Sequence, residues 1–283
     1  MVAIDAKTRM AGIIGWPVGH SLSPAMHNAV YDAMGMNWRY VAFPVRPERI
    51  AEAVYGIRAL NLAGVNVTIP HKETVMPHLD ELTPAARAIG AVNTIIVEDD
   101  RMIGDNTDVR GVLEALDQAG VSLAGRQALI LGAGGAARAA AWGLLTRHTR
   151  VALLARTPVR GERLAEDMRR VVPGADVTVV EQAPRSVDLL VNCTPVGMIP
   201  EPAHSPLPPG LTLDADTAVM DMIYRPLETT LLRQARQAGA RTVSGLDMLV
   251  YQGVIAFERW TGTLPPADVM RAACLSALGE QAR

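Results

Sequence analysis

The feature that most constrains the fold is a glycine-rich turn near the middle of the chain. Gly132-x-Gly134-x-x-Ala137 follows a short apolar run, residues 127–131, and opens a segment of helical composition, residues 136–146. In such a strand–turn–helix unit the first glycine permits the tight turn, the second lets a phosphate approach the backbone, and the small third residue allows close packing. Free N–H groups at the helix start favour an anion. The pattern predicts a dinucleotide site formed by Gly132, Ala133, Gly134, Gly135 and Ala136.

The residues that end the next expected strand indicate which dinucleotide binds. A site for NAD carries Asp or Glu about twenty residues after the glycines, where the carboxylate accepts a hydrogen bond from the ribose 2′-hydroxyl. This chain has Ala155-Arg156-Thr157 there, followed by Arg160. A guanidinium and a hydroxyl bind a 2′-phosphate that a carboxylate would repel. We therefore predict NADP as the cofactor. The alternative is that Arg156 is an ordinary solvated charge.

Short apolar runs alternate with helical patterns along the whole chain, which is typical of α/β proteins with parallel sheets. Strands are expected near residues 11–15, 38–43, 64–67, 91–97, 102–104, 127–131, 150–155, 176–180, 187–192 and 218–222. Helices are expected over residues 23–34, 47–60, 107–119, 136–146, 160–171, 246–261 and 266–278. The proline-rich stretch 200–210 is expected to be a loop, because proline lacks the N–H that ladders and helices need.

Length and composition narrow the class of protein. A chain of 283 residues is longer than one compact core usually holds, so two domains are expected. The net charge of −2, with acids and bases interspersed, argues against a nucleic-acid or membrane-surface partner. The two cysteines, Cys193 and Cys274, are too few for a disulfide framework and lack metal-ligand spacing. With no signal peptide or apolar span in view, we expect a cytoplasmic protein without a metal site.

Lysine is almost absent from this chain, and one of its two positions is conspicuous. Of the 27 basic residues only Lys7 and Lys72 are lysines. An ammonium group loses its proton far more readily than a guanidinium. Lys72 is therefore a candidate proton donor and acceptor, although it is also consistent with an ordinary surface charge.

Lys72 belongs to a series of polar motifs that together resemble one family. They are Gly19-His-Ser21-Leu-Ser23-Pro24, Asn66-Val-Thr68-Ile-Pro70-His-Lys72, Gly90-Ala-Val-Asn93-Thr94, Gly104-Asp-Asn-Thr-Asp108-Val-Arg-Gly111, Asn192-Cys-Thr-Pro-Val-Gly-Met198, Asp221-Met-Ile-Tyr224-x-Pro226, Gly245-Leu-Asp-Met248-Leu-Val-Tyr-Gln252-Gly253 and Phe257-Glu-Arg-Trp260-Thr-Gly262. In this order they resemble the shikimate dehydrogenase family over essentially the whole chain.

The resemblance implies an activity and a set of site residues. The family reduces 3-dehydroshikimate to shikimate with NADPH, on the route to aromatic amino acids. Lys72 and Asp108 match its catalytic pair, in which the ammonium protonates the nascent alkoxide and the carboxylate orients the amine. Ser21 and Ser23 correspond to the hydroxyls that bind the substrate carboxylate. Thr68, Asn93 and Gln252 correspond to groups that read ring hydroxyls. The residues that would line the cleft from the nucleotide side correspond to Met222, Tyr224, Gly245 and Met248.

The same resemblance implies the domain organisation. Because Gln252 follows the nucleotide unit, the C-terminal helices must return to the first domain. We expect a discontinuous α/β substrate domain, residues 1–107 completed by 246–283, and a Rossmann-like, doubly wound NADP domain, residues 108–245. The active site is then expected in the cleft between the domains, and the protein is expected to be a monomer or a homodimer.

Simpler roles exist for several of these residues. Ser21 could close a turn, Ser23 could cap a helix, Asn93 could form a turn and Asp108 could be a charge favoured by a helix N-terminus. Two other functions also compete, a quinate/shikimate dehydrogenase and a catalytically silent metabolite sensor of this fold. Quinate-preferring relatives tend to carry threonine and an acidic residue where this chain has Ser23 and Arg156. A family member that acts on another cyclitol, or on an amino analogue of shikimate, is a third possibility.

Overall fold

The computed structural model describes residues 3–281, and within them the strands form two six-stranded sheets. The chain divides into two compact units. One consists of the residues up to Thr107 together with those from Val250 onward, and the other is Asp108–Leu249. The α/β class is therefore confirmed, with one discontinuous unit and one continuous unit.

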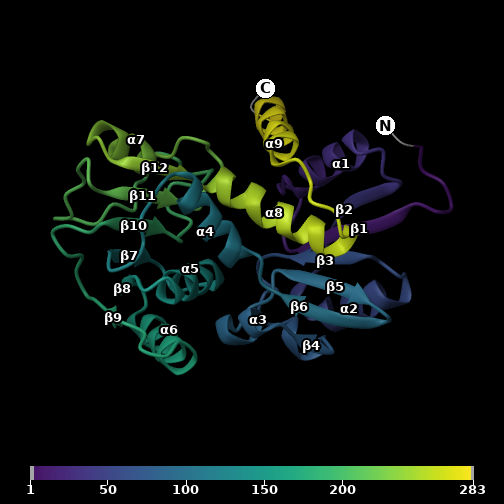
Figure 1. Cartoon of the computed structure of the whole chain (residues 1–283), viewed down its shortest axis with the longest axis horizontal. Coiled ribbons are helices and arrows are strands. Elements are labelled where there is room, and N and C mark those ends of the chain that lie inside the picture. Colours follow the sequence, from purple (N-terminus) through teal and green to yellow (C-terminus); the bar gives the residue numbers. More distant parts are fainter. Residues whose placement is uncertain (1–2, 282–283) are drawn as a thin grey trace. The chain divides into compact units, whose positions relative to one another are not determined.

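The first unit is built on a mixed sheet with the strand order β2-β1-β3-β5-β6-β4 (Figure 1). Its strands are β1 (Arg9–Gly15), β2 (Trp38–Pro44), β3 (Gly64–Val67), β4 (Glu81–Leu82), β5 (Thr94–Glu98) and β6 (Arg101–Asp105). Its helices are α1 (Ser23–Ala33), α2 (Ile50–Ala59), α3 (Pro84–Ile89), α9 (Ala267–Gln281) and the second part of α8 (Gly245–Thr261).

Strand direction brings separate chain segments to one edge of this sheet. β1 is parallel to β3, so both strands end at the same edge. β5 is antiparallel to β3 and to β6, so β5 begins there and β6 ends there. The loop after β1, the turn after β3, the residue before β5 and the residues after β6 therefore meet at what we call the polar edge.

The hairpin between β5 and β6 follows from its sequence. Glu98 pairs with Arg101, and the two residues between them, Asp99 and Asp100, have φ values of 47° and 64°. Two left-handed residues between paired strands form the tight turn that matches strand twist. The strands expected near residues 91–97 and 102–104 are therefore joined by a tight hairpin turn.

Two apolar clusters hold the first unit together. Aliphatic side chains from β1, β3, β5 and α2 form the larger one, which includes Ile14, Val54, Val65 and Ile95. An aromatic cluster lies between α1, β2 and α8, where His27 stacks on Tyr40 with ring centroids 4.4 Å apart. Helix α1 also packs against α9, so the C-terminal helix belongs to this core.

The second unit is a parallel, doubly wound sheet with the strand order β12-β11-β10-β7-β8-β9. Its strands are β7 (Gln127–Leu131), β8 (Arg150–Leu154), β9 (Val177–Val179), β10 (Leu189–Asn192), β11 (Ala218–Asp221) and β12 (Arg241–Ser244). Its helices are α4 (Asp108–Gln118), α5 (Gly135–Thr146), α6 (Pro158–Val171), α7 (Thr230–Gln237) and the start of α8. Figure 1 shows the strands in this order, from β12 beside α7 to β9 beside α6.

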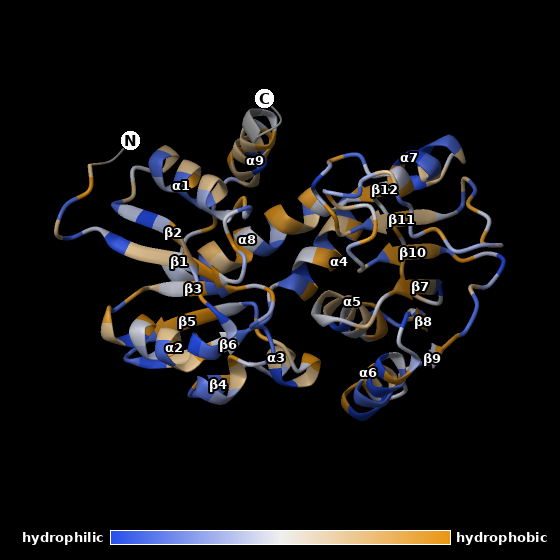
Figure 2. Cartoon of the chain, turned by 180° about the vertical axis from the view of Figure 1, so that it is seen from behind, coloured by the Kyte–Doolittle hydropathy of each residue, from blue (hydrophilic) through white to orange (hydrophobic). Residues whose placement is uncertain are grey.

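This order is that of the Rossmann fold, with β7 first, β8 and β9 on one side, and β10, β11 and β12 on the other. The central strands β7 and β10 are covered on both faces and are strongly hydrophobic (Figure 2). Their carboxyl ends lie on either side of the point where the strand order reverses, which is where such sheets bind ligands.

The expected elements differ from the structure mainly at short segments. Residues 47–49 form a 3₁₀ turn (Pro47–Arg49), because Arg49 leaves the helical region with φ −109° and ψ 11°. The strand expected over residues 91–97 begins at Thr94, because the Val92 N–H bonds to the Lys72 carbonyl instead of a strand. β12, a four-residue strand with one apolar side chain, was not expected, and neither was α7. β12 forms because it pairs with β11, and this pairing cannot be predicted from the local sequence.

Candidate active site

The glycine-rich turn lies at the carboxyl end of β7, with Gly134 as the N-cap of α5. Gly132 has a φ of +102°, where a side chain would strain the backbone. Gly134 has an ordinary φ of −90°, and a Cβ built on it meets nothing within 4 Å among the described residues. No contact within the described protein therefore explains a glycine at position 134. Its absent side chain leaves room for a phosphate at the helix N-terminus, so this turn fits a dinucleotide.

The other residues predicted for this turn lie around it. Ala133 separates the two glycines, and Gly135 and Ala136 are the first residues of α5. Ala137, the third position of the pattern, is fully buried, as close packing between helix and strand requires. The backbone N–H of Gly132 donates to the Leu154 carbonyl over 2.9 Å, which joins the turn to the end of β8.

A cationic surface follows β8 at the place predicted for the ribose. Ala155, Arg156 and Thr157 come directly after the strand, and α6 begins at Pro158 with no acidic residue in its first turn. Arg156, Thr157 and Arg160 are exposed. Within residues 3–281 no carboxylate forms an ion pair with either guanidinium. Both remain available for an anionic group.

A buried carboxylate organises the loops after β10 and β11. Asp221 is fully buried and accepts hydrogen bonds from Asn192 Nδ2 (2.9 Å), Thr229 Oγ1 (2.6 Å) and the Ile223 N–H (3.1 Å). Burial raises the pKa of Asp221. Asn192 Oδ1 in turn accepts from the Thr194 hydroxyl over 2.7 Å. This network ties together both loops at the carboxyl edge of the sheet.

The residues predicted to line the active site from the nucleotide side lie on or next to these loops. Met222 and Tyr224 follow Asp221 and are half-buried. A Cβ on Gly245 would lie 2.5 Å from the Met222 carbonyl, so only glycine lets α8 begin against this loop. Met248 is one turn further along α8. Cys193 Sγ lies 3.6 Å from Met222 Sδ, and burial raises the pKa of this thiol, which argues against a reactive cysteine.

The two serines lie on the loop after β1, at the polar edge of the first unit. The N-cap of α1 is Leu22, and no side chain caps the helix, so Ser23 is not an N-cap. Ser21 Oγ accepts from the Ser23 N–H over 3.2 Å. The buried Ser23 hydroxyl is hydrogen-bonded to Tyr40, whose hydroxyl donates to Asn66 Oδ1 over 2.7 Å.

Thr68 and Lys72 lie on the turn after β3, at the same edge. The Thr68 N–H donates to the Ile14 carbonyl over 2.9 Å, and a Cβ on Gly15 would overlap the Thr68 methyl group. The Lys72 carbonyl accepts from the Val92 N–H over 2.7 Å. The Lys72 side chain is half-buried. These backbone bonds hold the turn against both β1 and the segment before β5.

Asn93 completes the polar edge and forms a dense set of hydrogen bonds with Thr107. Asn93 Oδ1 accepts from the Thr107 N–H (2.7 Å), and Asn93 Nδ2 donates to Thr107 Oγ1 (3.0 Å). The Thr94 hydroxyl also donates to Asn93 Oδ1 over 3.0 Å. Asp108 follows Thr107 directly as the first, buried residue of α4. The structure thus brings Ser21, Ser23, Thr68, Lys72 and Asn93 to one edge of one sheet.

Gln252, on α8, is buried. The residues that sequence reasoning did not select are those that connect the selected ones, namely Tyr40, Asn66, Asp105, Thr107, Thr229 and Arg259. Asn66, Asp105 and Thr107 lie within the motifs given above, and this position in a motif could have identified them as site residues. Arg259 also lies within one of these motifs. Tyr40 and Thr229 lie outside them, and no feature of the neighbouring sequence singles them out.

Two further observations concern the described residues only. Within residues 3–281, no group of three or more His, Cys, Asp or Glu side chains is arranged to hold a metal ion. None of the helices in that range is long and apolar enough to cross a membrane.

Comparison with protein families gives two matches. Residues 13–95 match the shikimate dehydrogenase substrate binding domain, and residues 245–275 match the shikimate 5′-dehydrogenase C-terminal domain. A relative from Symbiobacterium thermophilum, named shikimate dehydrogenase (NADP(+)), is 50% identical over 96% of this chain and 96% of its own length.

Solved structures give the same result. A shikimate dehydrogenase in complex with NADP⁺ superposes with a TM-score of 0.92 at 41% identity, covering 98% of each chain. The shikimate 5-dehydrogenase from Thermus thermophilus, in complex with NADP(H) and shikimate, has a TM-score of 0.86 at 40% identity and covers 95% of this chain and 99% of its own.

Proposed function

Because this chain belongs to the shikimate dehydrogenase family, we propose that it interconverts 3-dehydroshikimate and shikimate with NADP(H). It is an oxidoreductase that acts on small molecules and uses NADP as its cofactor. The observation that carries the proposal is the polar edge. There, segments that carry hydroxyl, amide and ammonium groups come together, and Thr107 at this edge leads directly into the buried Asp108.

Lys72 supplies the proton in this proposal. Reduction of a ring carbonyl produces an alkoxide, and the Lys72 ammonium donates a proton to that oxygen. In the reverse direction the neutral amine takes the hydroxyl proton. A positioned acid–base group of this kind contributes about 10²- to 10⁴-fold to a rate. Asp108 orients the amine and balances its charge. The half-buried Lys72 lies on a turn that backbone bonds hold in place, which supports a fixed position for the ammonium.

The remaining polar groups orient the substrate. Ser21 and Ser23 bind its carboxylate, and the Ser23–Tyr40 hydrogen bond supports a functional orientation of that hydroxyl. Thr68, Asn93 and Gln252 read ring hydroxyls, and Tyr224 contacts the substrate from its own loop. Asn93 is held by Thr107 on both of its amide atoms, so its orientation is set before a substrate arrives.

The NADP-binding residues act in three groups. When bound, NADPH supplies the hydride. The backbone of residues 132–136 holds the pyrophosphate, and the open position at Gly134 supports this. Arg156, Thr157 and Arg160 bind the 2′-phosphate next to Ala155. Met222, Gly245 and Met248 line the nicotinamide side, on loops that Asp221 orders.

The domain roles follow from these assignments. Residues 1–107, completed by 246–283, form the substrate domain, and residues 108–245 form the NADP domain. Hydride transfer requires the substrate and the nicotinamide to meet. The net charge of −2 supports the absence of nucleic-acid and membrane-surface partners. The proposal includes a cytoplasmic location and a monomer or a homodimer.

Initial rates of NADP reduction by shikimate, compared with quinate and with NAD, test the proposal. We expect the highest kcat/KM with shikimate and NADP. Comparable rates with quinate or with NAD would assign the chain to the quinate/shikimate branch and remove the argument from Ser23 and Arg156. Absence of turnover with every pair would refute the proposed reaction.

A further inference from the structure

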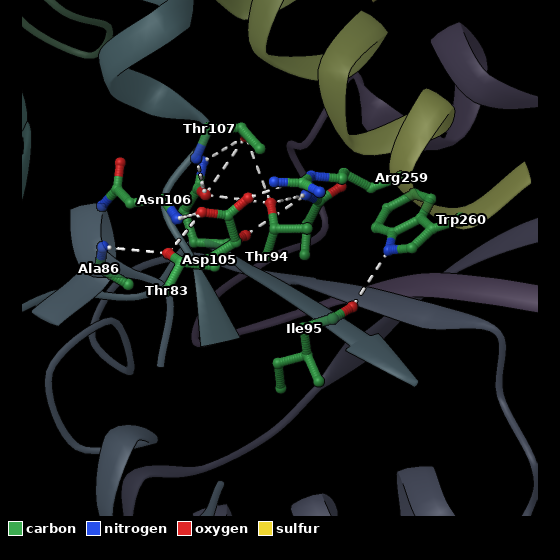
Figure 3. A network of polar contacts seen from close by, with 11 residues as sticks. Thr83, Ala86, Thr94, Ile95, Asp105, Asn106, Thr107, Arg259 and Trp260 are labelled. Atoms are coloured by element: carbon green, nitrogen blue, oxygen red, sulfur yellow. Dashed lines mark hydrogen bonds and ion pairs between the residues drawn. The ribbon is translucent and has the colours of Figure 1, made fainter. Parts of the chain in front are cut away.

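Another buried carboxylate, Asp105, lies at the polar edge, where β6 ends (Figure 3). It is the last residue of β6. Its Oδ1 accepts hydrogen bonds from Thr83 Oγ1 (2.7 Å) and from the Asn106 N–H (2.8 Å). Its Oδ2 lies 3.5 Å from Arg259 Nε, on helix α8. The carboxylate therefore joins β6, the N-cap of α3 and helix α8.

The contact with α8 has a second component one residue further on. Trp260 Nε1 donates to the Ile95 carbonyl of β5 over 3.0 Å. A Cβ on Gly64 would overlap the same indole nitrogen, so β3 passes directly under this ring. The end of α8 is thus attached to the sheet by one ion pair and one buried hydrogen bond, which Figure 3 shows side by side.

The helix that is held in this way carries Gln252. Residues seven apart lie on the same face of a helix, about 10 Å apart along its axis. Gln252 and Arg259 are seven apart on α8, and Ala256 between them is fully buried on that face. A rotation or slide of α8 at Arg259 would therefore move the Gln252 amide.

The strand that is held, β6, is hydrogen-bonded to Asn93, another of the proposed substrate-reading residues. The Asp105 carbonyl accepts from the Asn93 N–H over 3.0 Å. The next residues along the chain are Asn106, whose Nδ2 donates to the Ala91 carbonyl over 2.9 Å, and Thr107, which binds both amide atoms of Asn93. Asp105 is thus bonded to the segment that orients Asn93 and leads into Asp108.

We infer that Asp105 and Arg259 are positioning residues for substrate binding. Their ion pair sets the distance between Gln252 on α8 and Asn93 on the sheet, and so adjusts the site to the ring of its substrate. The inference rests on the proposed function of that site. The Arg259 side chain is 52% exposed, so the pair contributes little to stability, and its effect lies in geometry.

Arg259→Gln and Asp105→Asn, assayed in the full-length protein, test the inference. Each should raise the KM for shikimate roughly tenfold, which is the loss expected when one substrate hydrogen bond is misaligned. The KM for NADP should change by less than about twofold. Most of the proposed cofactor residues lie on other elements, and Gly245 and Met248 lie at the opposite end of α8 from Arg259. Arg259→Lys should restore part of the lost affinity, because an ammonium can still pair with Oδ2. In a double-mutant cycle the two effects should be clearly less than additive.

The matched control is Arg101→Gln. Arg101 lies at the other end of β6 and pairs with Glu81 on an exposed surface. This variant should leave both KM values unchanged. The inference would be overturned if Arg259→Gln left the KM for shikimate unchanged or raised the KM for NADP by the same factor. Additive effects of the two substitutions in the double-mutant cycle would also overturn it. If Asp105→Asn does not fold, the half-exposed Arg259 variants still decide the question.

Amide hydrogen exchange over residues 250–261 separates this inference from the proposed function. We expect faster exchange at the end of α8 in Arg259→Gln and no change in Arg101→Gln. Unchanged exchange in Arg259→Gln would show that the Asp105–Arg259 ion pair does not hold the end of α8. If the unmodified protein oxidises no shikimate, the proposed function fails, and exchange alone judges whether the ion pair holds the helix.

Discussion

At the scale of single residues, the scarcity of lysine permits an unusually direct test of the proton donor. Lys72→Ala should lower kcat by at least about a hundredfold and leave the KM for shikimate comparatively unchanged, because proton transfer fails while the substrate remains positioned. Lys72→Arg should be nearly as damaging, because arginine keeps the charge but does not give up its proton. Steady-state rates at pH 7 measure both variants.

The other lysine provides the control for this test. Lys7 lies on an exposed turn before β1, remote in sequence from every motif. Lys7→Ala should retain wild-type kcat and KM. Near-normal turnover in Lys72→Ala would exclude the acid–base role and leave Lys72 as a surface charge.

The two glycines of the nucleotide turn should respond differently to alanine. Gly134→Ala should raise the KM for NADP by roughly tenfold, because its Cβ would occupy the space for a phosphate. The free energy of unfolding should change by less than about 1 kcal/mol, because that Cβ meets no described atom. Gly132→Ala, at φ +102°, should cost about 1–3 kcal/mol of stability.

Urea unfolding and cofactor kinetics of both variants check this contrast. Equal losses of stability in the two variants would mean that Gly134 has a structural role after all. An unchanged KM for NADP in Gly134→Ala would remove the pyrophosphate from this turn.

At the scale of elements, the close approach of α8 to β3 depends on Gly64. A Cβ there would overlap the Trp260 indole, which is held by its bond to Ile95. Gly64→Ala should therefore destabilise the protein by about 1–3 kcal/mol, because a well-packed interior resists added volume. Gly56→Ala is the control. Gly56 lies on α2, and among the described residues no atom outside its own helix backbone comes within 4 Å of an added Cβ. Gly56→Ala should increase the free energy of unfolding by about 0.5–1 kcal/mol.

Chemical unfolding in urea measures both glycine variants. A loss of stability in Gly56→Ala as large as that in Gly64→Ala would show that the contact with Trp260 is not the cause. A neutral Gly64→Ala would mean that the tryptophan yields easily, and this would weaken the argument that α8 is rigidly attached.

At the scale of the whole molecule, the buried His27 should make stability depend on pH. The ring is fully buried and stacked on Tyr40, and burial lowers its pKa to about 3 from 6.5. The folded protein keeps His27 neutral, whereas the unfolded chain takes up a proton below about pH 6.5. The unfolded state then binds more protons, so stability falls as pH decreases from about 6.5 towards 3. The slope approaches 1.4 kcal/mol per pH unit.

Comparison with His27→Phe isolates this contribution, since all other titrating groups are common to both proteins. The free energy of unfolding, measured in urea at pH 7 and pH 5, should fall more in the unmodified protein than in the variant. A difference that is the same at both pH values would show that His27 is not a source of acid sensitivity.

The part of the site that sequence could predict is the part set by neighbours along the chain. The Gly132 turn, the Ala155-Arg156-Thr157 stretch and the turn of Asp99 and Asp100 each depend on backbone angles and residue types within a few positions. For this reason the α/β class and the dinucleotide unit could be recognised before any coordinates. The preference for NADP rested on the same kind of local signal, the absence of a carboxylate after β8.

What only the tertiary structure decided is which distant residues meet. Asp105 pairs with Arg259, Asp221 accepts a hydrogen bond from Asn192, and Tyr40 links Ser23 to Asn66, in each case across segments far apart in sequence. The short strand β12 likewise forms only because β11 is beside it. Such contacts depend on strand register and on the burial of polar groups that must find partners, and these are properties of the packed molecule.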